Sequence, residues 1–272
     1  MLRIHDIDGR DQPPRRVRIR AHNADIKVGD FVSVKAVISG PPGRATPGGY
    51  NPRRAAYFKG LGGYGYAITP FEIDAEQSLR QGQTLARRLI IFRYALAKRI
   101  KEASPASTAG LQAALMTGLR ADIKPKQVDA LRASGLAHIL AISGLHMGLF
   151  AGTFYSLISL CLATIPVLAS GRDVRKFAAG AGIAAATLYL LVSGASVATQ
   201  RAYIMAVILF LAVILDRQAL STRSVSLAAL ITLLLRPESL LSVGFQMSFA
   251  AVLALVVVYR HWADWQTDRG WV

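Results

Sequence analysis

The apolar stretch from Leu136 to Gly171 contains no Asp, Glu, Lys or Arg, and further uncharged blocks follow it as far as Tyr259. A membrane-spanning helix needs about 20 consecutive apolar residues. The first stretch is longer than that. It therefore predicts either one long span, closed by Pro166, or a short re-entrant piece followed by a span. A buried helical core in a soluble protein is the competing interpretation, and the succession of uncharged blocks disfavours it.

The later blocks define the expected membrane domain. They cover residues 177–199, 202–215, 224–235 and 240–259. The Ser193-Gly-Ala-Ser196 segment predicts a break beside short or tilted helices that line a cavity. By the positive-inside rule, two connections are expected on the cytoplasmic side, and Arg201 then lies between spans on the opposite side or within the membrane. The basic residues of these two connections are Arg172, Arg175, Lys176, Arg217 and Arg223.

Charge is concentrated in the first half of the chain. The 272 residues include 32 Lys and Arg against 16 Asp and Glu, a formal net charge of +16. This excess favours an acidic partner, either nucleic acid or anionic lipid headgroups, and composition does not separate the two. We expect an α+β protein with a basic β domain over residues 1–75, connecting amphipathic helices over 76–133 and a polytopic transmembrane α-helical domain over 134–272.

The first region has the pattern of a small β domain. Strands are expected over residues 17–20, 31–38 and 65–69, with a Gly- and Pro-rich loop before a helix over 53–59. Asn51 is the expected cap of that helix, Pro52 its first residue and Gly60 its end. Short strands with one helix suit an OB-like β-barrel, a fold that binds single-stranded nucleic acid on basic and aromatic surfaces.

Five residues of this region are candidate DNA-binding residues, because they combine positive charge with aromatic rings on which bases can stack. They are Arg53, Arg54, Tyr57, Lys59 and Tyr64. In the alternative interpretation the tyrosines are core or turn residues and the arginines form a solvated helix face.

Residues 78–101 have helical periodicity, with apolar residues at three- to four-residue spacing and basic residues between them. Such a helix either lies on a membrane surface, with its cations extended to headgroups, or packs as an ordinary amphipathic helix on the barrel. Pro105 interrupts it, and residues 106–118 predict a second helix of mostly small residues.

Polar residues are costly inside a membrane unless they face other helices or water, so they are candidate functional residues. Three clusters contain them: Ser143 with His146, Ser193 with Arg201, and Gln246 with Ser248. A Ser–His pair has the chemistry of a nucleophile and its base, although no uncharged block carries a partner carboxylate. Interhelical hydrogen bonding among these residues is the plainer interpretation.

The segments 137–152, 193–206 and 236–250 resemble, in order, three signature segments of the ComEC competence proteins, membrane channels that carry single-stranded DNA into bacteria. Pro47-Gly-Gly-Tyr-Asn51 and Gly60-Leu-Gly-Gly-Tyr-Gly-Tyr66 resemble the extracellular OB-like domain of that family. The resemblance implies a multi-pass protein of the bacterial inner membrane, with single-stranded DNA, membrane lipids and other DNA-uptake proteins as partners. It points to Ser143, His146, Arg201 and Gln246 as elements of the conduit or of its supporting core.

The chain departs from the family pattern at both ends. Family members usually begin with membrane spans, and many end with further spans and a metallo-β-lactamase-like domain that carries His-x-His-x-Asp-His; neither feature occurs here. We therefore expect a fragment of a longer channel protein, with no metal, no cofactor and no enzymatic activity in these residues. Two rival functions remain open: a transporter of a small molecule or lipid intermediate, and an intramembrane hydrolase that uses Ser143 and His146.

Overall fold

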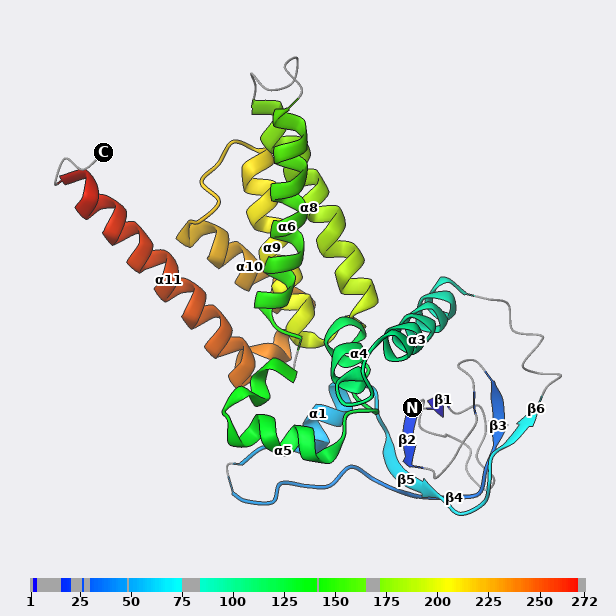
Figure 1. Cartoon of the computed structure of the whole chain (residues 1–272). Coiled ribbons are helices and arrows are strands. Elements are labelled where there is room, and N and C mark those ends of the chain that lie inside the picture. Colours follow the sequence, from blue (N-terminus) through cyan, green and yellow to red (C-terminus); the bar gives the residue numbers. More distant parts are fainter. Residues whose placement is uncertain are drawn as a thin grey trace. The chain divides into compact units, whose positions relative to one another are not determined.

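The computed structural model describes residues 2–3, 16–20, 26, 30–47, 49–74, 84–140, 142–164 and 172–268. The chain forms two compact units, residues 1–88 and residues 89–272. The first is a small β unit and the second is helical, so the protein is of mixed α and β structure (Figure 1). Pro166, the expected end of the first apolar block, lies outside the described residues.

The β unit contains two separate sheets. The larger has the strand order β1-β2-β5-β4, in which only β2 and β5 run parallel, and the smaller pairs β3 with β6. The strands are β1 (Leu2–Arg3), β2 (Arg16–Arg20), β3 (Phe31–Ser33), β4 (Ala36–Ser39), β5 (Gly63–Ala67) and β6 (Glu72–Asp74). The described strands do not close into a barrel, so the OB-like prediction is met only as far as a small sheet is present.

The prediction of a single strand over residues 31–38 is wrong. The chain leaves β3 after Ser33 and enters β4 at Ala36, and the two strands pair with different sheets. Between them the backbone N–H of Lys35 donates to the Thr69 hydroxyl at 3.1 Å. In β5, a Cβ on Gly65 would lie 2.1 Å from the Val37 carbonyl oxygen, so only glycine allows β4 to approach this closely.

The helix predicted after the Gly- and Pro-rich loop is confirmed as α1 (Pro52–Phe58). The Asn51 side chain accepts a hydrogen bond from the backbone N–H of Arg54 at 3.2 Å, as an N-cap does. Gly60 follows the helix with φ +63°, a backbone conformation that glycine adopts without strain. The expected cap, first residue and end are therefore all correct.

The helical unit begins with the basic helix α3, continues with two short helices and a 3₁₀ piece, and then has a series of apolar helices. The elements are α3 (Leu85–Ala103, which begins before the unit boundary), α4 (Ala109–Thr117), α5 (Pro125–Ala133), η1 (Leu136–Leu140), α6 (Gly144–Ala163), α8 (Arg172–Val192), α9 (Val197–Ile214), α10 (Thr222–Leu235), η2 (Pro237–Leu241) and α11 (Val243–Asp268). The described part of the first apolar block is thus a short 3₁₀ piece followed by one long helix, and that the short piece is re-entrant stays a prediction.

Among the residues that the structure describes, four helices are long and apolar enough to cross a membrane, so the protein is of the multi-pass type by length and composition. The candidate spans are Gly144–Ala163, Val174–Val192, Val197–Ile214 and Val243–Trp262. The prediction that one apolar block ends at residue 199 and the next begins at residue 202 is wrong. The chain breaks at residues 193–196, so Arg201 lies inside α9 and not between two spans.

Small residues let three of these helices pack closely. α6, α8 and α9 run side by side (Figure 1) around a core of Met147, Ala151, Ala179, Ala186 and Phe210. A Cβ on Gly182 would lie 2.7 Å from the Phe210 ring, so this glycine makes room for the ring. A second cluster, in which Ile208, Ala228, Phe245 and Phe249 meet, joins α10 and α11 to α9.

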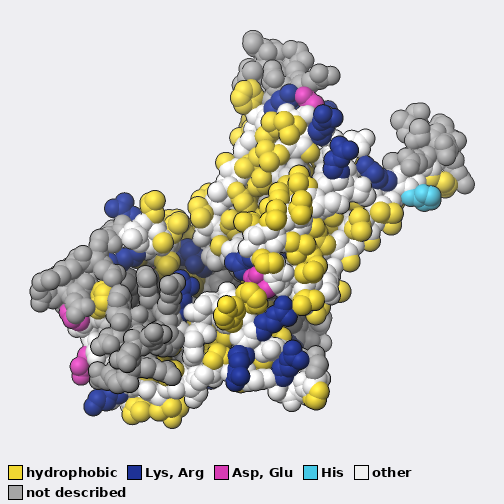
Figure 2. Space-filling model, turned by 180° about the vertical axis from the view of Figure 1, so that it is seen from behind, with side chains coloured by type: hydrophobic (Ala, Val, Ile, Leu, Met, Phe, Trp, Pro, Cys, Tyr) yellow, Lys and Arg dark blue, Asp and Glu magenta, His cyan; other side chains and the backbone are white. Residues whose placement is uncertain are grey.

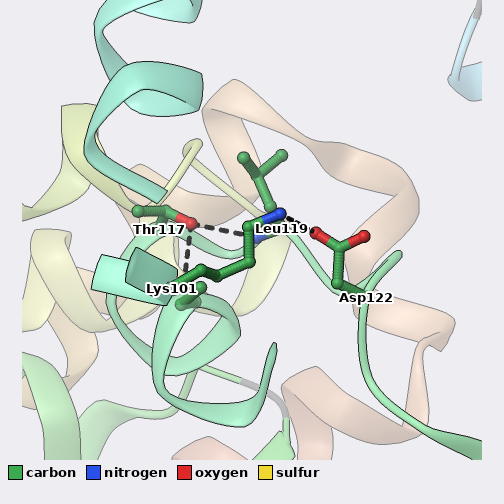
Figure 3. Close-up of polar contacts among 5 residues, drawn as sticks. Lys101, Thr117, Leu119 and Asp122 are labelled. Atoms are coloured by element: carbon green, nitrogen blue, oxygen red, sulfur yellow. Dashed lines mark hydrogen bonds and ion pairs between the residues drawn. The ribbon is translucent and has the colours of Figure 1, made fainter. Parts of the chain in front are cut away.

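The turn after α4 is fixed by polar contacts (Figure 3). The buried Thr117 hydroxyl donates to the Ala113 carbonyl at 2.7 Å and accepts from the Leu119 N–H at 3.4 Å. Lys101 of α3 pairs with Asp122 beyond the turn, with Nζ and Oδ2 2.8 Å apart. Because the ion pair is partly exposed, it helps to orient the turn against α3 but adds little to the free energy of unfolding.

Candidate functional site

Most of the predicted polar residues of the helical unit gather at one end of the bundle, where α6, α9 and α11 begin and α8 ends. We call this the polar end. Three close approaches define it. A Cβ on Gly144 would lie 3.9 Å from the Ala202 Cβ, and one on Gly118 would lie 2.4 Å from the Ser193 carbonyl oxygen. The third is a hydrogen bond from the Arg201 guanidinium to the Gly244 carbonyl at 3.0 Å.

Ser143 and His146 form the start of α6. Ser143 is the N-cap, and its backbone N–H donates to Nδ1 of His146 at 3.2 Å. The Ser143 hydroxyl oxygen is 3.0 Å from the same Nδ1. A side chain three residues after the cap that accepts from the cap N–H is one half of a capping box. Ser143 and His146, three residues apart, therefore form a hydrogen-bonded pair that caps the start of α6.

The same geometry bears on the hydrolase alternative. A neutral imidazole has one acceptor nitrogen with a single in-plane lone pair. At His146 the Ser143 backbone N–H and the Ser143 hydroxyl both approach this one nitrogen, so the hydroxyl would have to share it with the cap N–H. The described residues contain no cluster of three or more His, Cys, Asp or Glu that could hold a metal ion. The geometry favours capping over nucleophilic catalysis.

The break between α8 and α9 is a sharp turn in which two residues have a left-handed backbone conformation. Gly194 has φ +82° and Ala195 has φ +49°. The Ser196 hydroxyl then caps α9 by accepting from the Thr199 N–H at 3.2 Å, and the Gln200 amide donates to the Ala195 carbonyl at 2.9 Å. Ser193 is buried and donates to the Leu190 carbonyl at 3.1 Å. The predicted Ser193 site residue thus supports the turn.

The connecting helix α3 contributes a residue whose role the sequence did not reveal. Arg93 donates from Nε to the Val192 carbonyl at 2.9 Å and from Nη2 to the Thr117 carbonyl at 2.7 Å. These carbonyls end α8 and α4, where backbone oxygens lack helical partners and favour a cation. Burial lowers the pKa of the Arg93 guanidinium from its ordinary value. The ordinary pKa of an arginine is so high that Arg93 keeps its charge at neutral pH.

Arg201 is a half-buried cation near the start of α9. Its Nη2 donates to the Gly244 carbonyl, whereas its Nε is buried and has no hydrogen-bond partner among the described residues. No carboxylate of the described part of the chain pairs with it. It lines a hollow of about 20 Å³, room for roughly one water molecule. The lining residues are Val197, Gln200, Arg201, Ile204, Thr232, Leu235, Arg236 and Ser239.

The α11 candidates are less enclosed. Gln246 is exposed, and its amide donates to the Leu240 carbonyl of η2 at 3.1 Å. Ser248 is half-buried two residues further along. Arg236, which precedes η2, was missed as a site residue, although it opens the third signature segment and shares the hollow with Arg201. The signal in the sequence that could have identified Arg236 was a single arginine between two apolar blocks.

In the β unit, α1 presents the predicted basic and aromatic residues to solvent. Arg53, Arg54, Tyr57 and Lys59 are exposed, and Tyr57 is 78% exposed, so this tyrosine is not a core residue. Arg53 Nε donates to the Pro41 carbonyl at 3.4 Å, and the Arg54 guanidinium lies 5.9 Å from the centre of the Phe58 ring. Tyr64, on β5, is half-buried.

The sheet adds residues that the sequence did not identify. In the parallel β2–β5 pair, Arg18 lies opposite Tyr64 and Arg20 opposite Tyr66. Both arginines and Tyr66 are exposed, whereas Val17 of β2 is fully buried. The alternation of arginines with apolar residues over 17–20 was the signal for a basic strand face. Without the pairing it did not reveal that tyrosines stand beside the arginines.

Comparison with known proteins identifies the family. A model of the competence protein family matches residues 115–271. ComE operon protein 3 of Bacillus subtilis (strain 168) is 24% identical over 246 residues, which are 90% of this chain and 30% of that protein. Competence protein ComA of Neisseria gonorrhoeae is 37% identical over 148 residues, 54% of this chain and 21% of that protein.

Recombination protein 2 of Haemophilus influenzae (strain ATCC 51907 / DSM 11121 / KW20 / Rd) is 29% identical over 216 residues, 79% of this chain and 25% of that protein. The chain thus spans less than a third of the length of each of these relatives. No solved structure matches the chain. Because the family model covers more than half of its residues, including four candidate spans, the chain belongs to the competence protein family.

Proposed function

We propose that this chain is part of a channel in the bacterial inner membrane that transports single-stranded DNA into the cytoplasm during natural transformation. The observation that carries the proposal is Arg201, a cation inside a candidate span that is paired with a carbonyl and with no described carboxylate. An unneutralised cation in a low-dielectric site is costly, and such residues mark the pathway of an ion or substrate. A DNA strand supplies the missing negative charge through its phosphates.

The arrangement of the polar end supports this role. Helix starts at α6, α9 and α11 bring backbone N–H groups and positive helix-dipole ends to the same region as Arg201. Broken helices that point such ends at an anionic substrate are a recurring device in transport proteins. The path itself would run between helices beyond this end, because the hollow beside Arg201 is only about 20 Å³ in volume.

The β unit supplies a surface suited to gathering the strand. The exposed residues of α1 and the Arg18–Tyr64 and Arg20–Tyr66 pairs put cations next to aromatic rings. Phosphate contacts and base stacking together bind single strands with little sequence preference. We assign Arg53, Arg54, Tyr57, Lys59 and Tyr64 to this surface, with Arg18, Arg20 and Tyr66 as additions.

The transport role is tested in the complete gene of a transformable bacterium. Arg201→Ala should abolish transformation while DNA still binds at the cell surface, because the substitution removes a cation from the path and leaves the β unit intact. Arg201→Lys should recover part of the activity, since a point charge replaces the guanidinium. Arg99→Gln is the matched control, because Arg99 is an exposed arginine of α3 outside the spans. Normal transformation by Arg201→Ala, at normal protein level, would contradict the site.

His146 separates a capping role from a chemical one. His146→Gln retains an acceptor for the Ser143 N–H, as in an ordinary capping box, and should preserve both protein level and transformation. His146→Ala removes that acceptor and should lower both. If instead a serine-reactive probe labelled Ser143 and His146→Gln prevented the labelling, the hydrolase alternative would replace the channel.

Binding of the strand is tested on the whole chain in detergent. Affinity for single-stranded DNA should fall steeply as salt increases, because each phosphate contact releases a counterion. Arg18→Gln with Arg20→Gln should weaken binding and flatten the salt dependence, whereas the exposed pair Arg120→Gln with Lys126→Gln should change neither. Binding to anionic liposomes without binding to DNA would favour the transporter alternative.

A further inference from the structure

The end of the helix bundle opposite the polar end carries a ring of cations, which we call the basic collar. It consists of Arg175, Lys176, Arg217, Arg223 and Arg260. Two contacts show that these residues share one end. Lys176, at the start of α8, pairs with Asp216 after α9, with Nζ and Oδ2 2.7 Å apart. Arg260 of α11 donates to the Gln218 side chain in the α9–α10 connection at 3.2 Å.

The connections between the long helices differ in charge from one end of the bundle to the other, although Arg93 and Arg201 also lie at the polar end. The connection at residues 193–196, at the polar end, has no Lys or Arg, and that at 236–242 has Arg236 alone. All five collar residues lie at the other end, and four of them are exposed. Figure 2 shows Lys and Arg side chains gathered at the upper end of the helices, above a long apolar surface. Most of the collar charge is therefore not neutralised within the described residues.

Aromatic residues accompany the collar on α11. Tyr259, Trp262 and Trp265 are 58%, 59% and 50% exposed. Tyr and Trp gather at the level of lipid headgroups, where their rings have one apolar and one hydrated edge. Trp262 and Trp265 also line an open apolar hollow on the face of α11 itself, together with Val257, Val258 and His261. This apolar surface extends along α11 on both sides of Arg260, so a cation and apolar side chains stand together as the headgroup and acyl chains of an anionic phospholipid require.

We propose that the basic collar binds anionic phospholipid headgroups of the cytoplasmic leaflet, with an acyl chain along the apolar hollow of α11. Juxtamembrane Lys and Arg residues are attracted to the negative surface potential of that leaflet, and short basic connections stay on the cytoplasmic side. The polar end and α3 to α5 then face outward. The proposal rests on the membrane spans and on the charge distribution, and it is independent of DNA transport.

The chain contains its own probe for this site. Of its three tryptophans, Trp262 and Trp265 lie at the collar end of α11, and Trp271 is outside the described residues. The full chain is reconstituted in phosphatidylcholine vesicles that contain either brominated phosphatidylglycerol or brominated phosphatidylcholine, because bromine quenches tryptophan fluorescence at contact. The collar predicts stronger quenching by the brominated phosphatidylglycerol at equal mole fraction. Equal quenching by the two lipids would overturn the proposal.

A variant that combines Arg217→Gln, Arg223→Gln and Arg260→Gln should lose this preference, by about fivefold in relative binding constant for each arginine removed. The matched control combines Arg99→Gln, Arg120→Gln and Lys126→Gln, which are exposed cations outside the collar. The control should keep the full preference. A preference that survives in the collar variant would also overturn the site.

Orientation is tested in cells without removing a single collar residue. In a Cys161→Ser background, which lacks other cysteines, Leu220→Cys probes the collar end and Ser242→Cys probes the polar end. A membrane-impermeant maleimide should label Ser242→Cys in intact spheroplasts and Leu220→Cys only after lysis. The reverse labelling would overturn the assignment of the collar to the cytoplasmic leaflet.

Discussion

The guanidinium of Arg93 donates to the carbonyl of Val192, 99 positions further along the chain, at a distance of 2.9 Å. A second bond to Thr117 ties the same side chain to the end of α4. One cation therefore satisfies the last carbonyls of two helices and holds the turn that separates two candidate spans. This relationship connects the segment before the membrane domain to the polar end.

Arg93→Gln should destabilise the protein by roughly 2–3 kcal/mol, because it removes a charge-assisted hydrogen bond and leaves a helix-end carbonyl without its donor. Thermal unfolding in detergent, followed by tryptophan fluorescence, measures the change. Arg99→Gln on the same helix is the control and should lie within about 0.5 kcal/mol of the parent, because Arg99 is exposed. Equal effects of the two substitutions would contradict the role of Arg93.

Gly194→Ala should be among the most damaging small substitutions. Its Cβ would lie 2.1 Å from Nη2 of Arg93, and φ at this position is +82°, a conformation that costs an L-residue about 1–2 kcal/mol. We expect a loss of at least about 2 kcal/mol in the same unfolding measurement. Gly148→Ala in α6 has no atom within 4 Å of the new Cβ and should be neutral or stabilising by up to about 1 kcal/mol.

Gly182 and Phe210 should show coupled effects on stability. Gly182→Ala places a Cβ 2.7 Å from the ring and should cost about 1–3 kcal/mol by overpacking. Phe210→Leu opens space at the same point, so the double variant should lose less stability than the sum of the single variants. A double-mutant cycle measures the difference, and simple additivity would show that the ring does not constrain Gly182.

Ser221→Ala removes the N-cap of α10, in which the Ser221 hydroxyl accepts from the Ser224 N–H at 3.1 Å. The expected loss is about 1 kcal/mol of unfolding free energy. Ser159→Ala is the matched substitution inside α6. The buried Ser159 hydroxyl has no partner among the described residues, so its removal should be neutral or slightly stabilising. A larger loss at Ser159 than at Ser221 would contradict both assignments.

Local signals predicted the local structure well. Asn51, Pro52 and Gly60 define α1 by capping rules that depend only on neighbouring residues, and the Ser193–Ser196 segment gave the break between α8 and α9 for the same reason. The membrane helices followed from their lengths of apolar sequence. In each case the information lies within a few residues of the feature it determines.

What the sequence did not reveal depends on distant partners. The apolar blocks alone leave Arg201 either between two spans or within the membrane, and its bond to the Gly244 carbonyl is a contact with a distant residue that accompanies its place inside α9. Arg93 has the same helical spacing as the exposed cations of α3, and only the Val192 carbonyl distinguishes it. The split of residues 31–38 into β3 and β4 likewise depends on which strands they pair with.

Helix α10 has a consequence for the surrounding lipid. Its 14 residues rise only about 21 Å, whereas the hydrocarbon core of a bilayer is about 30 Å thick. Arg236 follows directly after it, so α10 is too short to cross that core on its own. Bilayers accommodate such a short apolar segment by local thinning or by extending flanking cations to the headgroups.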